Sequence, residues 1–496
     1  MTLDPITLTL VQNRLDHISQ QMGWVMIRTA RSPIFSQAHD FSCFITDATG
    51  YILAQADGLP IHTGGGGFAV RALVEAFGDD IADGDVFVLN DPYAAGGNHL
   101  PDWVISRPVF VDERLVGFCS NRAHQSDIGG GAAGSYNSRA TEIFHEGLRL
   151  PPVRLVDAGV TRRDVWSLLL LNSRTPNLME GDLRAMLGST RIGADQIAEL
   201  ACELGAESQA YFDGILDVGD RRMRAEIANL PDGVYHGLSC VDSDGVVNEP
   251  LKIDLKITKQ DGDLYFDLSG SSPPCQGPMN SVLATTKSSI YLAMKHIFSE
   301  VPINAGMFEP LHITDPEGTF LYAQYPRPVS GCAAEVSQRI AEAVFDALAK
   351  AIPERLFAAP AGTSGNFALG GYDPGRERAY VLYFFTGGGY GGSPQGDGLT
   401  NGCSTIGISK SQPVEVLEQR YPVLFDEYSL HEGSGGAGEY RGGFGINYTV
   451  RLRRGTARAS MVMDHGRVGP NGMAGGAPGG VNRVRVTRED GMYHPP

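Results

Sequence analysis

The sequence predicts an α+β fold with mixed, largely antiparallel sheets and helical layers, arranged in two to three lobes. Segments with helical apolar spacing alternate with paired apolar runs that are typical of β-hairpins. The chain has 496 residues, of which 42% are hydrophobic. A chain of this length usually forms more than one hydrophobic core. Its 63 glycines lie in clusters between the periodic segments. They indicate many tight turns, or loops whose backbone approaches a ligand closely.

The first element is expected to be an amphipathic helix that begins at Asp4 and Pro5, because aspartate caps helices and proline fits their first turn. The apolar residues that follow are spaced by three or four positions, as one face of a helix requires: Leu8, Val11, Leu15, Ile18, Met22 and Val25. The next two runs, 41–46 and 51–55, have the pattern of a β-hairpin, with Asp40 at the start of its first strand.

Glycine and hairpin patterns continue after this hairpin. Glycines occupy 64–67, just before a helical pattern over 68–77. They either shape a turn or leave backbone N–H groups at the helix start, where a phosphate or carboxylate would dock. Two apolar runs, 104–111 and 115–118, flank the polar residues 112–114 and predict a second hairpin.

Three helices are predicted in the middle of the chain, over 164–171, 179–204 and 206–227, because apolar residues recur there with few breakers. Four residues of the second helix are expected in the core: Met186, Ile192, Ile197 and Leu200. Near residue 230 the pattern changes from helices to strands. This change is the clearest domain boundary in the sequence.

Beyond the boundary, residues 251–257 alternate strictly between apolar and polar, so one face of this strand is solvated, and 264–268 completes a hairpin with it. Helices are expected over 284–298 and 334–351, and the remainder is glycine-rich with short strands such as 448–452. Three lobes are therefore expected: an α/β lobe with a helical segment over 1–230, a strand-rich lobe with helices over 231–352, and a glycine-rich lobe with strands over 353–496.

Charge and motif content exclude several classes of protein. The net charge of −17 argues against nucleic acid and anionic membranes as partners. The N-terminus lacks the pattern of a signal peptide, and no apolar run reaches the ~18 residues that suggest a membrane span. Seven cysteines without a C-x-x-C pair suggest reduced thiols and a cytoplasmic location. The sequence has no P-loop for ATP and no nucleophile elbow.

A candidate metal site lies around the second hairpin. His99 and Asp102 stand three positions apart just before it, and His124 stands at its end. Because the ends of a hairpin lie close together, His124 returns to the neighbourhood of the other two. Imidazole and carboxylate are ligands of hydrolytic zinc and manganese sites, and three protein ligands leave a position open for water. These residues are also common in turns, and no compact metal motif is present, so spacing alone leaves both interpretations open.

A series of motifs runs through nearly the whole chain, among them NDPY, HLPD and AHQSDIGG. They lie at 28–33, 39–43, 60–64, 90–93, 99–102, 123–130, 146–152, 279–281, 302–306, 335–340, 389–391, 397–398 and 433–443. In this order they resemble the hydantoinase B/oxoprolinase family. Its members are the beta-type subunits of ATP-dependent lactam and hydantoin hydrolases, and subunits of acetone and acetophenone carboxylases are relatives.

The resemblance implies a metal-containing subunit of a hetero-oligomeric hydrolase. An ATP-binding partner of the hydantoinase A type phosphorylates a cyclic amide such as 5-oxoproline, a hydantoin or a lactam. Water activated at the metal then attacks the activated carbon, and phosphate leaves. The first alternative is a subunit of a ketone carboxylase of the acetone or acetophenone type, which would need bicarbonate. The second is a non-catalytic subunit whose metal is structural and is held by four protein ligands.

The resemblance also implies a ligand set of His99, Asp102 and His124, with Asp40 as the fourth ligand. Zinc, manganese and iron(II) all suit such a set.

Further residues are expected around the metal by the same resemblance. Asp127 and Asn98 would surround the ligands, with the carboxylate of Asp127 orienting an imidazole. His62 and Glu142 are candidates for transferring a proton or positioning the substrate, and His62 is equally well interpreted as a core histidine. Asp91 either belongs to the surroundings of the metal or caps a turn.

Overall fold

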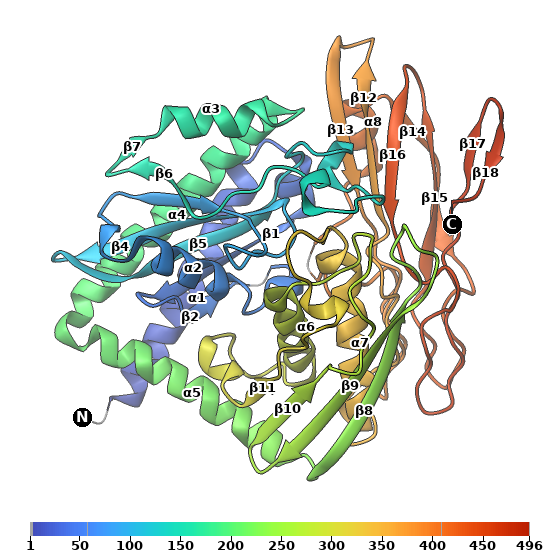
Figure 1. The fold of residues 1–496 in the computed structure, drawn as a ribbon. Helices are drawn as coiled ribbons and strands as arrows, with labels where there is room; N and C mark the ends of the chain where they lie inside the picture. Colours follow the sequence, from blue (N-terminus) through green and yellow to red (C-terminus); the bar gives the residue numbers. More distant parts are fainter. Residues whose placement is uncertain (1–2, 57, 408, 496) are drawn as a thin grey trace.

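The computed structural model describes residues 3–56, 58–407 and 409–495. Its helices and mostly antiparallel sheets confirm the predicted α+β class (Figure 1). The largest sheet has the strand order β2-β1-β5-β4-β3-β6-β7, and every neighbouring pair is antiparallel. Its strands are β1 (Phe41–Asp47), β2 (Ile52–Gln55), β3 (Val86–Leu89), β4 (Asp102–Val111), β5 (Arg114–His124), β6 (Val153–Asp157) and β7 (Val160–Thr161). Both predicted hairpins are present.

Helices cover both faces of this sheet. On one face, α1 (Pro5–Thr29) and α4 (Pro176–Leu204) pack against the strands, and on the other face lies α2 (Gly66–Phe77). The strands are therefore buried on both sides, and β1 is buried at every position. The helices α3 (Arg163–Leu171) and α5 (Ser208–Ala228) complete this part of the molecule.

The helix α1 forms as the sequence predicts. The Asp4 carboxylate accepts hydrogen bonds from the backbone N–H groups of Ile6 and Thr7, so it satisfies donors that the first turn leaves free. The apolar residues that face the sheet and α4 are buried: Val11, Leu15, Ile18 and Met22.

One core prediction for α4 is wrong. Met186, Ile197 and Leu200 are buried, but Ile192 is 37% exposed. At about 100° per residue, Ile192 lies more than a quarter turn away from the face that Met186 and Ile197 share. Its apolar character alone did not place it in the core.

The glycines at 64–67 permit close packing. Gly64 has φ of 72°, a conformation that residues with a Cβ atom rarely adopt. A Cβ atom at Gly66 would overlap the ring of Phe44. The backbone N–H of Gly64 donates to Gln55 Oε1. These contacts account for the glycines by turn geometry, and anion binding at this helix start stays a prediction.

A second sheet follows the long helices, with the order β11-β10-β9-β8. It contains β8 (Gly233–Val241), β9 (Leu251–Gln260), β10 (Asp263–Asp267) and β11 (Leu311–Ile313). Along β9 buried residues alternate with more exposed ones, which confirms the solvated face. The other face packs on α7 (Ser337–Leu348), and α7 packs on α6 (Leu283–Ile297). The predicted helix over 334–351 is regular only in α7, because a π-helical turn, Cys332–Val336, precedes it.

The C-terminal strands lie along one side of the molecule (orange to red in Figure 1). A three-stranded sheet has the order β13-β12-β16, with β12 (Asn366–Asp373), β13 (Arg378–Phe384) and β16 (Ala457–Val462). Beside it are α8 (Val414–Arg420) and two hairpins: β14 (Val423–His431) with β15 (Gly445–Leu452), and β17 (Val486–Arg488) with β18 (Gly491–Tyr493).

Each predicted lobe has its own sheets, but the main apolar cluster extends from Val11 to Val462. The boundaries near 230 and 352 thus mark a change of sheet, and their role as domain boundaries stays a prediction. All seven cysteines are free. Among the helices of the described residues, none is both long and apolar enough to cross a membrane.

The close contact between β8 and α7 gives a prediction about stability. A Cβ atom at Gly237 would overlap the carbonyl oxygen of Ala343 in α7. Gly237→Ala should therefore lower the free energy of unfolding by about 1–3 kcal/mol, as overpacking usually does. Gly233→Ala in the same strand is the control, since its Cβ would meet only Tyr235 atoms at 3.7 Å. Equal denaturation midpoints for the two variants would contradict the prediction.

Candidate functional site

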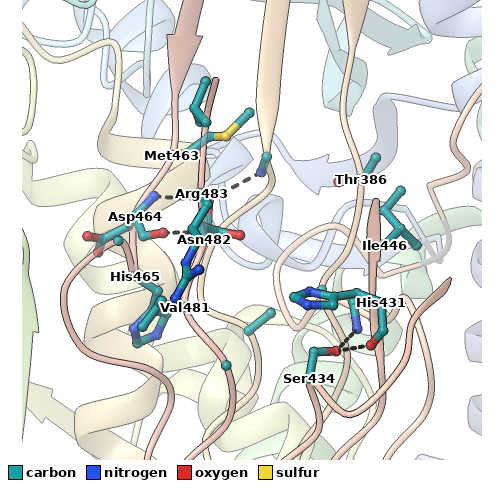
Figure 2. A pocket seen from close by; sticks show the side chains of 18 of the residues that line it. Thr386, His431, Ser434, Ile446, Met463, Asp464, His465, Val481, Asn482 and Arg483 are labelled. Carbon is teal, nitrogen blue, oxygen red and sulfur yellow. Dashed lines mark hydrogen bonds between the residues drawn. The ribbon is translucent and has the colours of Figure 1, made fainter. Parts of the chain in front are cut away.

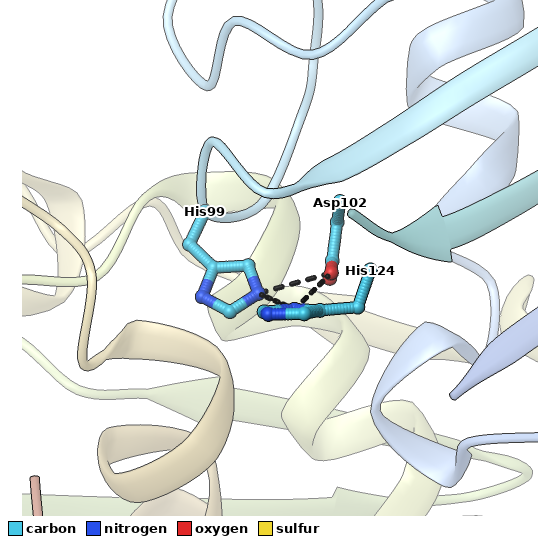
Figure 3. Close-up of side chains that lie close together, drawn as sticks. All are labelled: His99, Asp102 and His124. Atoms are coloured by element: carbon cyan, nitrogen blue, oxygen red, sulfur yellow. Dashed lines mark hydrogen bonds and ion pairs between the residues drawn. The ribbon is translucent and has the colours of Figure 1, made fainter. Parts of the chain in front are cut away.

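The β4–β5 hairpin brings the predicted ligands together. Asp102 begins β4, His124 ends β5, and the two residues are direct register partners. His99 lies in the loop just before β4 (Figure 3). Asn90 holds this loop in place, because its side-chain N–H donates to the carbonyl oxygens of Leu100 and Leu148.

Three side chains offer one ligand atom each at nearly equal separations. His99 Nε2 lies 3.0 Å from Asp102 Oδ1, His124 Nδ1 lies 3.1 Å from the same oxygen, and the two nitrogens are 3.3 Å apart. Two ligand atoms bound at about 2.1 Å to one ion are about 3.0–3.4 Å apart for angles between the right angle and the tetrahedral one. The spacing therefore fits a divalent metal ion. The three residues are each 2% exposed.

The tautomer of His99 suits a ligand. Its Nδ1 lies 3.1 Å from the carbonyl oxygen of Ser330, which only accepts hydrogen bonds, so Nδ1 carries a proton and Nε2 is the nitrogen that faces Asp102 and His124. Glu146 fixes that carbonyl in turn, since its carboxyl group accepts the backbone N–H groups of Val329 and Ser330. Metal-binding histidines commonly donate their second ring N–H to such a partner.

His62 lies against the same carboxylate. Its Nε2 is 3.2 Å from Asp102 Oδ2 and its Nδ1 is 3.0 Å from Ser42 Oγ. Because an ionised carboxylate is only an acceptor, Nε2 carries the proton and Nδ1 accepts from the Ser42 hydroxyl. His62 thus holds Asp102 Oδ2 and leaves Oδ1 directed toward His99 and His124.

The buried charges set the protonation states. Burial opposes ionisation of Asp102, but the nearby His99 and hydrogen bonds from three histidines hold the pKa of its carboxyl well below the usual range. Burial lowers the pKa of His62 and of His124, so both imidazoles are neutral at pH 7. Neutral imidazole and ionised carboxylate are the forms that bind metals. Burial opposes protonation of His99, but the charge and hydrogen bond of Asp102 outweigh it and raise the pKa of His99, so metal binding at His99 would release a proton.

Asp40, the expected fourth ligand, lies nearby. Its backbone oxygen accepts the N–H of His124. Burial, reinforced by the charge of Asp102, raises the pKa of its carboxyl to about 8. Among the described residues, only His99, Asp102 and His124 form a group whose ligand atoms all lie within 4.8 Å of one another. The role of Asp40 as a ligand stays a prediction.

The other expected residues lie farther from the three ligands. The Asp127 carboxylate accepts the N–H groups of Gly129 and Gly134 and pairs with Arg174, so its hydrogen bonds hold a loop. Glu142 lies at the surface, where it pairs with His145.

The side chains of Asn98 and Asp91 accept backbone hydrogen bonds in the turns before β4. The Asn98 side-chain oxygen accepts the backbone N–H of His99. Asp91 caps a turn through the N–H groups of Tyr93 and Ala94, which is one of the two roles expected for it.

The site includes residues for which no role follows from the sequence. The rings of Tyr136 and Tyr383 stack beside His124, with centroids 5.7 and 5.0 Å from its ring and interplanar angles of 21° and 18°. Glu146 stands at the start of the 146–152 motif, which is the only sequence signal for it. Ser330 and Tyr383 are more than 200 positions from the hairpin, and no motif marks them.

Glu146 makes stability depend on pH. Burial raises the pKa of its carboxyl from 4.5 to about 7. The folded state therefore loses stability as pH rises from about 4.5 to 7, because only the unfolded chain releases the proton there, at a cost of up to about 3 kcal/mol. Glu146→Gln should remove this contribution. Denaturation midpoints of both proteins across this range test it, and a pH-independent difference between them would contradict it.

Comparisons with known proteins show the family to which this chain belongs. The family model described as hydantoinase B/oxoprolinase matches residues 4–494. The beta subunit of caprolactamase from Pseudomonas jessenii is 35% identical over 96% of this chain and 83% of its own. The crystal structure of ATP-dependent caprolactamase from that organism has a TM-score of 0.91 at 32% identity, over 100% of this chain and 87% of that one. The nucleotide-free structure of an acetone carboxylase shares the fold. It has a TM-score of 0.89 at 21% identity, over 97% of this chain and 66% of that one. This chain therefore belongs to the hydantoinase B/oxoprolinase family.

Proposed function

We propose that this chain is the metal-containing subunit of an ATP-dependent hydrolase of cyclic amides. Its substrate is a 5-oxoproline, a hydantoin or a lactam that an ATP-binding partner subunit has phosphorylated. The buried cluster of His99, Asp102 and His124 carries the proposal, because its atoms are spaced as ligands of one divalent ion. Membership of the family and the similarity to caprolactamase support the choice of a cyclic amide.

His99, Asp102 and His124 would hold the ion, with Asp40 as a fourth ligand, and zinc, manganese or iron(II) would suit these donors. When bound, the ion would act as a Lewis acid and lower the pKa of water. A lactam is a poor electrophile, and phosphorylation of its oxygen converts that oxygen into a leaving group. ATP is assigned to a partner of the hydantoinase A type, since this sequence contains no P-loop.

The residues around the ligands have separate tasks in this proposal. His62 holds Asp102 through Oδ2, and the carbonyl oxygen of Ser330 holds the Nδ1 proton of His99. His62 is also the candidate for moving a proton, because it is the one further histidine that touches the ligands among the described contacts. The burial of all these side chains excludes bulk water, which would otherwise compete for a phosphorylated intermediate.

The metal assignment gives a direct prediction. His124→Ala should abolish binding of the ion while the fold is retained, because one of the proposed ligands is lost. Metal content measured by mass spectrometry, with circular dichroism for the fold, tests it. The matched control is His145→Ala, since His145 is half-exposed and pairs with the surface residue Glu142. A His124 variant with full metal occupancy would refute the assignment.

The substrate class is tested with the chain co-purified with its hydantoinase A-type partner. ATP consumption and product formation are measured with 5-oxoproline, hydantoins, caprolactam and simple ketones, each with and without bicarbonate. We expect turnover of a cyclic amide without bicarbonate. Turnover only of a ketone, and only with bicarbonate, would instead assign the chain to the carboxylases.

A further inference from the structure

The motif at 335–340 contains Glu335, a buried acidic residue that contacts connect to the candidate metal site. The π-helical turn Cys332–Val336 precedes α7 and is buried throughout. Such turns are rare and often occur at functional sites. Within it, Glu335 is fully buried. Its Oε1 accepts hydrogen bonds from Asn366 Nδ2 at 3.0 Å and from the backbone N–H of Ser364 at 3.4 Å.

A chain of hydrogen bonds leads from Glu335 to the metal centre. Asn366 donates to Glu335 and accepts the hydroxyl proton of Tyr383 with its side-chain oxygen. Tyr136 donates its hydroxyl proton to Tyr383, and the two rings are stacked 5.4 Å apart at 5°. The Tyr136 hydroxyl lies 3.4 Å from His99 Nδ1. Both rings flank His124.

His124 differs from the other two histidines in how it is oriented. The second ring nitrogen of His99 has a carbonyl partner, and that of His62 has a hydroxyl partner. His124 Nε2 is buried and has no hydrogen-bond partner among the described residues. Besides the contacts of Nδ1 with Asp102 and His99, the orientation of the His124 ring therefore depends on the rings that stack against it, and Tyr383 and Tyr136 are those rings.

We propose that Glu335 is a positioning residue of the metal centre: through Asn366 it fixes Tyr383, and with it Tyr136, as an aromatic wall that orients His124. The inference rests on the proposed function, because it assumes that a metal binds at this site. It concerns the orientation of a ligand and not the choice of substrate.

Glu335 acts here as a neutral group. Burial raises the pKa of its carboxyl well above the usual range, and the nearby Asp464 raises it further. Asp464 lies in the wall of a cavity of about 2350 Å³, where Figure 2 shows it next to His465. Hydrogen bonds from Thr363 and from the backbone of Ser364 oppose this rise in the pKa without cancelling it.

Variants of Glu335 separate positioning from folding. Glu335→Gln keeps an oxygen that accepts from Asn366, so its metal affinity should equal that of the unaltered protein. Glu335→Ala removes that acceptor and should weaken metal binding about tenfold, which is at the lower end of losses seen when groups behind a metal ligand are removed. The probe is cobalt(II), whose visible spectrum reports ligand geometry. The spectrum of Glu335→Ala should change, and that of Glu335→Gln should not.

Two further measurements keep the test decisive. Asp182→Ala is the matched control, since Asp182 is also buried and acidic but binds the backbone N–H groups of Arg31 and Ser32. It should lower stability and leave the cobalt spectrum unchanged. If Glu335→Ala fails to fold, Tyr383→Phe replaces it, because it keeps the ring and removes only the hydroxyl group, with its contacts to Asn366 and Tyr136. An unchanged spectrum and affinity in the foldable variant would overturn the inference.

The inference and the proposed function fail in different ways. If the unaltered protein binds no cobalt, both the metal assignment and the positioning role are wrong. If it binds cobalt and the Glu335 variants behave as expected, but no cyclic amide is hydrolysed, only the proposed substrate is wrong.

Discussion

The antiparallel pairing of β4 with β5 places Asp102 opposite His124, and the candidate metal site is arranged around this pair. A shift of one residue in this register would turn one of the two side chains to the other face of the sheet. The shift is costly because both faces are covered, one by α1 and α4 and the other by α2. The same burial that stabilises the sheet therefore sets the positions of two ligands.

Burial raises the free-energy cost of ionised carboxylates in this site. A buried carboxylate costs several kcal/mol unless it is paired, and Asp102 and Asp40 lie close enough to raise the pKa of Asp40. Three histidines contact Asp102, and those contacts offset part of this cost. A divalent cation would offset more of it. Stability and metal binding would thus be coupled through the same few atoms.

The sequence predicts well what depends on nearby residues. The helix after Asp4, the two hairpins and the meeting of His99, Asp102 and His124 follow from local spacing, and the structure contains them. Ile192 was misplaced because apolar character says nothing about which face of a helix is covered. The partners of His99 and His124 could not be predicted, since Ser330 and Tyr383 reach the site through packing between segments more than 200 positions apart. Glu335 stands in a recognisable motif, but its contact with Asn366 requires the fold.

The enclosure of the three ligands also bears on rates. Each is 2% exposed, and Tyr383 on β13 closes one side of them. An ion or a substrate molecule can reach them only when neighbouring segments move apart, so exchange is limited by local opening and not by diffusion. A chelator would then remove the ion slowly even where binding is weak.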